Sequence, residues 1–434
     1  MRQLPAWTLA AAAVLAAAPA APAAPAAPAA PAAPAAPAAP AAPAAPVRAG
    51  ADCPRLTARW HGDDRARLQR VVDAYGTCSG HRGAVAAFDW DNTVTKNDVT
   101  DATLSWALRH DVLPRPARWK DTSAWLSDAA DRALTAACGT GAGGSLRTSD
   151  RPRCADEILE IRENATTVSG APAFAGTWNH RRTVPGYAWV PQLFAGRTPA
   201  RLASYAEAAR REALAAPVGA TRVLGTHTVP AYVRYYDQQR DLVRTLRRAG
   251  FRVYVVSAGA EPVTEVWSRA IGVDAAHTLA IRSVLDRRGR ITTRTEGCGG
   301  VPAGEGTVIP YIDGKRCRLN EDVYGIHGPA AWKKQPPSRR IALGAGDADT
   351  DVTFVGDATG AHLVVNRNKP ELMCRAYDDA DGRWVITPMF IGPLPRRAEP
   401  YPCSTGARTA ADGTRGPVRR PDDSVVPDLP DTVF

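Results

Sequence analysis

The sequence lacks the features that mark three large classes of protein. Its 54 Lys and Arg residues exceed its 44 Asp and Glu residues, giving a net charge of +10, but the basic residues are scattered and form no compact stripe. That distribution argues against nucleic-acid binding. The positive charge could instead help to attract small anionic substrates to the surface. None of the eight cysteines has the close paired spacing of a zinc site. The apolar run from Leu9 to Ala18 is too short, and too soon broken by proline, for a convincing membrane span.

The N-terminal region has the composition of an exported protein. Arg2, the apolar run and the small residues after it predict a secretory signal peptide over residues 1–20. Residues 21–50 repeat Pro-Ala-Ala, which excludes a regular helix and predicts an extended, semi-rigid linker. We therefore expect an extracellular protein, and an uncleaved signal would associate it with the cell envelope through this N-terminal segment.

The cysteine count agrees with export. An even number of cysteines in an exported chain indicates disulfides, although a sequence does not fix their pairing. We predict pairing between nearest neighbours: Cys53–Cys78, Cys138–Cys154, Cys298–Cys317 and Cys374–Cys403.

One acidic stretch follows a buried strand. The small apolar residues 83–87 predict the strand, and Phe88-Asp89-Trp90-Asp91-Asn92-Thr93 comes directly after it. Buried carboxylates are costly unless they are paired or bind a metal, whereas acids at the carboxyl end of a parallel strand lie where open α/β sheets bind ligands. Asp89 could then act as a nucleophile and Asp91 as a proton donor. Taken alone, the stretch is equally consistent with an acidic turn.

Two more strands end in polar residues. A helix over residues 237–249 precedes a strand over 252–256, which ends in Ser257-Ala258-Gly259 before a helix starts near Pro262. Backbone amides at such a helix start form a ready anion site. A strand over residues 340–344 leads into Asp347 and Asp351. Three strand ends of this kind in a βα-repeating chain are much stronger support for a functional site than one acidic turn.

Residues 98–236 show no strong strand periodicity and predict a mostly helical inserted module. The module carries an aromatic set that could surround a quaternary ammonium group by cation–π attraction, although ring by ring a place in the core is the better expectation: Trp106, Trp119, Trp125, Trp178, Tyr187, Trp189 and Phe194. Residues 404–434 are rich in Pro, Arg and Asp and predict a disordered tail.

The order of these motifs resembles the haloacid dehalogenase superfamily of phosphatases. The motifs are Asp-x-Asp-x-Thr, Ser after a strand, a lysine, and Gly-Asp-x-x-x-Asp, and they are similar to those of secreted phosphorylcholine phosphatases and the phosphoserine phosphatase branch. The resemblance covers about residues 80–97 and 237–375. It implies an α/β Rossmannoid core with a parallel sheet over residues 51–97 and 237–403, and a helical C1-type cap over 98–236.

The resemblance also implies roles for individual residues. Asp89 would attack phosphorus, and Asp91 would protonate the leaving oxygen and then activate water. Mg²⁺ would be held by Asp89, Asp347 and the backbone carbonyl of Asp91, with Asp351 as a further ligand or a supporting acid. The phosphoryl oxygens would be held, and the loop braced, by a further set of residues: Thr93, Ser257, Ala258, Gly259 and Lys315.

The choice of lysine leaves an alternative. Lys315 fits the motif, but it lies further along the chain from Asp347 than in compact members of the superfamily. Lys333 and Lys334 lie nearer, but they precede Gln335-Pro336-Pro337, as in a solvated loop.

The leading interpretation is a secreted Mg²⁺-dependent phosphomonoesterase that hydrolyses a small phosphate ester such as phosphocholine through an aspartyl-phosphate. Phosphoserine, phosphoethanolamine or a broad range of esters are the alternative substrates. A catalytically inactive envelope binding protein with the same fold is the alternative of another class. The sequence does not give the oligomeric state.

Overall fold

The computed structural model describes residues 53–434 except 142 and 305. The predicted signal peptide (1–20) and Pro-Ala linker (21–50) lie outside these residues. No helix in the described part of the chain is both long enough and apolar enough to cross a membrane.

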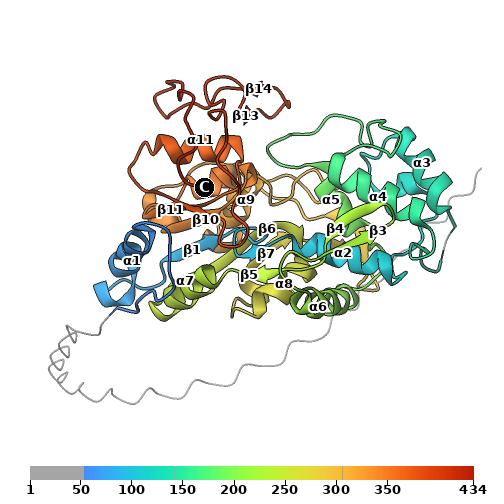
Figure 1. Cartoon of the computed structure of the whole chain (residues 1–434), viewed down its shortest axis with the longest axis horizontal. Coiled ribbons are helices and arrows are strands. Elements are labelled where there is room, and N and C mark those ends of the chain that lie inside the picture. Colours follow the sequence, from blue (N-terminus) through green and yellow to red (C-terminus); the bar gives the residue numbers. More distant parts are fainter. Residues whose placement is uncertain (1–52, 142, 305) are drawn as a thin grey trace, which may run out of the picture. The chain divides into compact units, whose positions relative to one another are not determined.

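The centre of the fold is a six-stranded parallel sheet with strand order β12-β11-β10-β1-β6-β7 (Figure 1). Its strands, in chain order, are β1 (Val85–Phe88), β6 (Arg252–Ala260), β7 (Thr278–Ile281), β10 (Leu343–Gly346), β11 (Ala361–Asn366) and β12 (Trp384–Pro388). The first strand, β1, pairs with β6 on one side and β10 on the other. The strand order therefore reverses at β1, and the carboxyl ends of all six strands lie at one edge, which is where such sheets bind ligands.

Helices cover both faces of the sheet, as the alternation along β1 shows. Ala86 and Phe88 belong to the core that includes helices α1 (Asp64–Tyr75), α7 (Asp237–Arg248) and α8 (Glu261–Arg269). Val85 and Ala87 belong to the core with α10 (Val352–Val355) and α11 (Pro370–Asp378). Because both faces are buried, the strands read as continuous apolar runs rather than as an alternating pattern.

The predicted elements around the second strand are confirmed, with one difference. Helix α7 buries Leu242, Val243 and Leu246, and Gly250 follows it with a left-handed φ of 83°. Strand β6 starts at Arg252, as predicted, but it runs on through Ser257 to Ala260 instead of ending in a loop. Strand β10 starts at Leu343, three residues later than predicted, and a short 3₁₀ turn at Pro337–Arg339 precedes it.

The insertion leaves the core after β2 (Thr95–Lys96) and returns at β5 (Arg234–Tyr235), and these two short strands pair antiparallel. It is mostly helical, as predicted, and it also contains a hairpin. Its elements are α2 (Val99–Arg109), α3 (Asp128–Cys138), α4 (Pro152–Asn164), α5 (Pro185–Gln192), α6 (Pro199–Ala215), β3 (Thr221–Leu224) and β4 (His227–Pro230).

A second hairpin, β8 (Ser283–Leu285) with β9 (Ile291–Thr295), extends from the core to the insertion. Ile291 exchanges backbone hydrogen bonds of 2.8 Å with Gly196 and Arg197. The insertion is therefore held by the core at a place other than its two chain connections.

The prediction of a disordered tail over residues 404–434 is wrong. This segment contains the strand pair β13 (Arg408–Thr409) and β14 (Arg415–Gly416), and it buries Val418 and Val426 against the α11 side of the core. Asn366 Nδ2 donates to Asp431 Oδ1 at 3.0 Å. The polar composition suggested disorder, but a few buried apolar side chains and hydrogen bonds order the segment.

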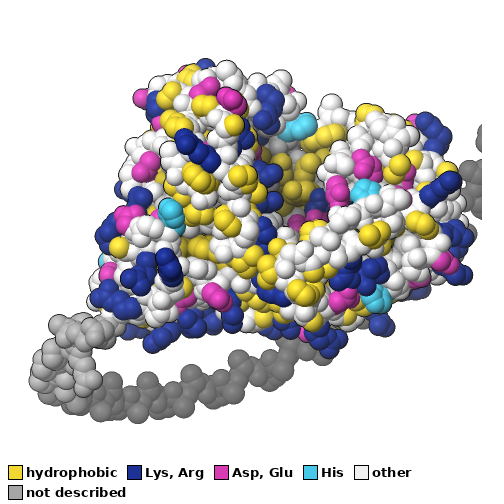
Figure 2. Space-filling model, in the orientation of Figure 1, with side chains coloured by type: hydrophobic (Ala, Val, Ile, Leu, Met, Phe, Trp, Pro, Cys, Tyr) yellow, Lys and Arg dark blue, Asp and Glu magenta, His cyan; other side chains and the backbone are white. Residues whose placement is uncertain are grey.

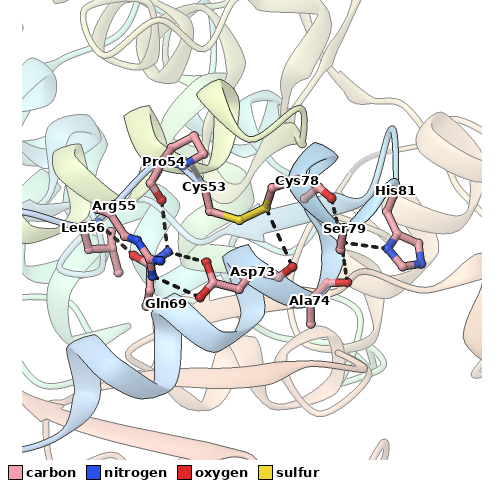
Figure 3. Close-up of a disulfide and its surroundings, with 11 residues drawn as sticks. Cys53, Pro54, Arg55, Leu56, Gln69, Asp73, Ala74, Cys78, Ser79 and His81 are labelled. Carbon is pink, nitrogen blue, oxygen red and sulfur yellow. Dashed lines mark hydrogen bonds and ion pairs between the residues drawn. A yellow bond between two sulfur atoms is a disulfide. The ribbon is translucent and has the colours of Figure 1, made fainter. Parts of the chain in front are cut away.

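All four predicted disulfides are confirmed. Figure 3 shows Cys53–Cys78, which ties residues 53–56 to the turn after α1. Gln69, in the middle of α1, adds two hydrogen bonds: it accepts from the amide of Leu56 and donates to the carbonyl of Pro54. Cys298–Cys317 fixes helix α9 (Asp313–Arg318). Four disulfides are compatible with an oxidising, extracellular setting.

Candidate active site

The parallel strands bring the predicted site residues to one edge of the sheet. Asp89 follows β1, and its backbone amide donates to Ala345 of β10 at 2.8 Å. Asp347 follows β10, Ser257 lies in β6, and Arg367 follows β11. Residues far apart in the chain therefore share one end of the sheet.

Lys315 is the lysine that reaches this edge. Its side chain is fully buried, and Nζ donates to Asp89 Oδ1 and, at 2.6 Å, to Asp351 Oδ1. The sequence Asp313-Gly314-Lys315-Arg316-Cys317 reads as a basic turn, but the structure forms the helix α9 there, with Lys315 two residues before Cys317. Lys333 and Lys334 are exposed.

Asp347 is fully buried and has both carboxylate oxygens engaged. Thr93 Oγ1 donates to its Oδ1 at 2.6 Å and to Asp89 Oδ2 at 3.1 Å, so Thr93 joins the two acids. Arg367 donates to Asp347 Oδ2 at 2.6 Å. Asp351 Oδ2 accepts from the backbone amides of Asp347 and Ala348 at 3.0 Å each, which fixes the loop after β10.

The cluster has the donor set of a hard divalent cation. Oxygen atoms from the carboxylates of Asp89, Asp347 and Asp351 lie within 4.8 Å of one another, and all three residues are buried. The three carboxylates face two cations, Lys315 and Arg367, so a bound Mg²⁺ would offset the negative charge that remains. The side chain of Asp91 is not one of the three grouped carboxylates. Asp351 is engaged by Lys315 and by two amides, but Asp89 and Asp347 also have both oxygens engaged, so these contacts leave Asp351 as either a ligand or a supporting acid.

Burial is the main cause of the pKa shifts at the site. It raises the pKa of Asp89 to about 6, with Lys315 opposing the shift and Asp347 adding to it. Burial also raises the pKa of Asp91 well above its usual value, and the nearby charge of Asp98 adds to this effect. Burial opposes the charged form of Lys315, but Asp351 and Asp89 outweigh it and raise the pKa of the ammonium group. The lysine therefore stays charged.

A cavity of about 280 Å³ opens onto these groups. Its inner wall includes Asp89, Asp91, Asp347 and Arg367, and its other wall comes from the insertion. On the face drawn in Figure 2, the surface is hollowed between the part that carries α9 and α11 and the part that carries α3 to α5, with apolar side chains on the walls and charged ones at the base.

The Ser257–Gly259 segment forms a tight part of this wall. Ser257 is buried, and its Oγ accepts from the amide of Gly259 at 3.0 Å. A Cβ at position 259 would lie 2.6 Å from Thr100 Oγ1 of α2 and 3.2 Å from Ser257 Oγ. A larger residue at this position would have to displace Thr100, so the sheet and the insertion approach closely here.

The insertion contributes three acids to the lining of the cavity. Asp98 caps α2 by accepting from the amides of Thr100 and Asp101, and burial, with Asp101 nearby, raises its pKa to about 7. Arg162 of α4 lies 3.0 Å from Asp101 and 4.6 Å above the ring of Tyr187. With Glu163, this wall carries three carboxylates and one guanidinium.

The predicted aromatic set does not form a cage around this cavity. Within the described residues, Tyr187 is the member of the set that lines it, and the guanidinium of Arg162 covers its ring. Trp119, Trp189 and Phe194 are buried in the core.

Sequence reasoning gave no role to three residues at the site. Arg367 had a signal, because it directly follows an apolar strand that ends at the same edge as the others. Asp98 could have been recognised as a helix cap with a second acid, Asp101, in the first turn. Arg162 had no sequence signal, because its partners lie far away in the chain.

No family model and no curated protein matches the chain. Solved structures do match. A conserved protein of unknown function from Anaerococcus prevotii is 15% identical, with 76% of this chain and 92% of that chain covered and a TM-score of 0.54. A protein of unknown function from Bordetella pertussis Tohama I is 18% identical, and the match covers 71% of this chain and 100% of that chain with a TM-score of 0.41. A substrate-bound phosphoserine phosphatase is 11% identical, and the match covers 65% of this chain and 86% of that chain with a TM-score of 0.29.

At 15% identity, the likeness to the Anaerococcus structure bears on the fold alone. The six-stranded parallel sheet and the mostly helical insertion confirm the predicted α/β class.

Proposed function

We propose that this protein is a phosphomonoesterase in which Asp89 receives the phosphoryl group. One observation carries the proposal: a buried aspartate at the end of the central strand pairs with a buried lysine and opens onto a cavity lined by a second aspartate, Asp91. Such a pair of acids can divide the work of nucleophile and proton donor.

In the first half-reaction, a carboxylate oxygen of Asp89 forms a bond to phosphorus while the bond from phosphorus to the ester oxygen breaks. The leaving oxygen takes a proton from Asp91. In the second half-reaction, Asp91 takes a proton from water, and the water oxygen attacks phosphorus. Phosphate leaves and Asp89 is regenerated. Val99 donates its amide to Asp91 Oδ1 at 2.7 Å, so the start of α2 holds the carboxyl group in place.

Positive charge near the phosphoryl group is the second requirement. Lys315 and Arg367 reach the cluster, so these two cations would bind phosphoryl oxygens as charge moves in the transition state. Ala258 and Gly259 line the same cavity. Asp89, Asp347 and the carbonyl of Asp91 would hold Mg²⁺, which when bound reduces the repulsion between an anionic nucleophile and an anionic ester.

The wall of the insertion supports a substrate with a cationic leaving group. Three carboxylates, those of Asp98, Asp101 and Glu163, face one guanidinium, that of Arg162. Carboxylates accept hydrogen bonds, which a primary ammonium donates and a quaternary ammonium does not. The lining therefore favours an ester such as phosphoethanolamine or phosphoserine over phosphocholine.

We also propose that the protein acts outside the cytoplasm. Its four disulfides support this location, because oxidising compartments preserve such bonds.

The test is phosphate release from phosphocholine, phosphoethanolamine, phosphoserine and p-nitrophenyl phosphate, each with Mg²⁺ and with a chelator. The native protein is compared with Asp89→Asn and with the matched surface variant Asp237→Asn, whose side chain is 85% exposed. We expect Mg²⁺-dependent release in the native protein and in Asp237→Asn, and none in Asp89→Asn.

Equal release from Asp89→Asn would exclude an aspartyl-phosphate on this residue. No release from any ester by the folded, Mg²⁺-loaded protein would favour the inactive binding protein instead.

A further inference from the structure

The C-terminal segment and α11 together form a groove lined by arginines. We name it the arginine groove and define it by Arg375 of α11 and by Arg408, Arg415 and Arg419 of the C-terminal segment. All four line a hollow of about 420 Å³, and no acidic residue lines it. Arg375, Arg408 and Arg419 also line an adjoining hollow of about 720 Å³. Neither group of lining residues includes any residue of the candidate active-site cavity.

The positive charge of the groove is poorly matched by the protein itself. Arg375 lies 3.6 Å from Glu371, but that carboxylate also binds Arg181 at 3.1 Å. Arg415 donates to neutral acceptors, the carbonyl of Gly406 at 2.8 Å and the hydroxyl of Thr409 at 3.0 Å.

The other two arginines are no better paired. Arg419 reaches Asp423 at 3.7 Å, and that carboxylate is 84% exposed, so water screens the pair. No carboxylate pairs with Arg408 within residues 53–434, positions 142 and 305 aside. The four guanidinium groups therefore share two distant carboxylates.

The acids of the adjoining hollow do not supply the missing charge, because each already has a partner of its own. The pairs are Asp313 with Arg181, Asp357 with Arg316, Asp378 with Arg420, and Asp381 with His362.

The crowding of cations affects Arg375 directly. Burial lowers its pKa, and the guanidinium groups of Arg181 and Arg408 lower it further, against the opposing effect of Glu371. Keeping Arg375 charged here costs free energy, and a bound anion would remove that cost.

We propose that the arginine groove binds a compound with a short run of phosphate groups, of the linear oligophosphate class. Guanidinium groups bind phosphate oxygens in pairs, with a geometry that lysine does not provide. One phosphate group carries about 1.5 to 2 negative charges, which would leave half of the four positive charges unmatched. Three linked phosphates match the charge. No aromatic ring lines the smaller hollow, so it offers no stacking platform for nucleic-acid bases.

The test is calorimetric titration of the full chain with linear tripolyphosphate, without added Mg²⁺. Three variants are compared: the double variant Arg408→Gln with Arg415→Gln, the charge-preserving variant Arg408→Lys, and Arg287→Gln. Arg287 is exposed in the β8–β9 turn and lines neither hollow, so it controls for loss of one positive charge. Neither Arg408 nor Arg415 has an ion pair within the described chain, so the double variant and Arg408→Lys are expected to fold. Circular dichroism checks that they do.

We expect tripolyphosphate to bind the native protein and Arg287→Gln equally, and the double variant at least tenfold more weakly. Arg408→Lys should bind with intermediate affinity, because it keeps the charge and loses the paired donors. No binding to the native protein would overturn the proposal. The proposal would also be overturned if Arg287→Gln weakened tripolyphosphate binding as much as the double variant does. It would be overturned as well if inorganic phosphate, a thymidine oligonucleotide or a sulfated polysaccharide bound more tightly than tripolyphosphate. Loss of phosphatase activity in the earlier assay leaves this result unaffected, because the two sites share no residue.

Discussion

Replacing Lys315 by methionine removes the positive charge that pairs with Asp89 and Asp351. Methionine has a similar length and leaves little empty space, so the change tests the charge and not the packing. Lys315 and Asp351 are fully buried, and Asp89 is 6% exposed, so water cannot replace the lost partner. Breaking a buried ion pair by removing one partner costs about 3–5 kcal/mol, because an unpaired charge remains inside the protein. We expect a loss of unfolding free energy of about that size.

A second change separates the cost of an unpaired charge from the loss of chemistry. Asparagine at position 351 is neutral, and its side-chain oxygen can still accept from the amides of Asp347 and Ala348. The double variant Lys315→Met with Asp351→Asn should therefore recover part of the lost stability, because removing both partners of a buried pair is often close to neutral. It should stay inactive, because the phosphoryl group still lacks its lysine.

The assay is urea unfolding followed by circular dichroism in the presence of chelator, together with phosphate release in Mg²⁺. Lys333→Met, an exposed lysine, is the matched control and should keep native stability and activity. The reasoning is refuted if Lys315→Met unfolds and turns over like the native protein, or if Lys333→Met loses as much activity.

Three further changes test other parts of the structure. Gly259→Ala places a Cβ 2.6 Å from Thr100 Oγ1, and we expect it to lower phosphate release at least tenfold, measured by kcat/KM. Replacing Cys298 and Cys317 by serine opens a loop with a sequence separation of 19 and should cost about 3 kcal/mol in urea unfolding, with lower activity because α9 carries the lysine. Burial raises the pKa of Asp64 to about 7, so the folded state holds a proton that the unfolded chain releases near pH 4, and stability falls as the pH rises from about 4 to 7. Asp64→Asn should remove that fall. The change in the free energy of unfolding from pH 5 to pH 8 should then be more favourable in this variant than in the native protein by about 2–4 kcal/mol.

Each of these predictions has a control and a contradicting result. Gly406→Ala, where a Cβ would meet nothing within 4 Å, should keep full activity, and normal turnover in Gly259→Ala would contradict the close approach of α2. Cysteine replacement at 374 and 403 should lower stability but leave the lysine in place. The exposed Asp237→Asn should show the native pH dependence of unfolding, and an Asp64→Asn profile with the same slope would contradict a buried, protonated Asp64.

Elements with local signals could be predicted from the sequence. Helix α6 spans Pro199–Ala215, and its start has clear local signals, because Thr198 caps it and Pro199 suits the first turn. The acids after β1 and β10 were found because parallel strands place their carboxyl ends together.

Elements that depend on distant partners could not be predicted. Helix α9 has only six residues, too few to show a helical period, so Lys315 was expected in a turn. The valines buried in the tail, Val418 and Val426, are covered by α11 and its neighbours, which lie far away in the sequence. The acidic wall of the cavity was missed because Arg162 meets Asp101 only in the folded protein.

Because β2 pairs with β5, the chain enters and leaves the insertion at two points that lie side by side. Tyr236 donates its amide to the carbonyl of Val94 at 2.9 Å, and Asn97 Nδ2 donates to the carbonyl of Tyr232 at 2.8 Å. Two chain ends held this close can accept a segment of almost any length, because the entropy of closing a loop grows slowly with its size. The segment between these strands can therefore be exchanged in evolution, or by design, for one that selects a different alcohol, while the sheet, Asp89 and Asp347 keep their places.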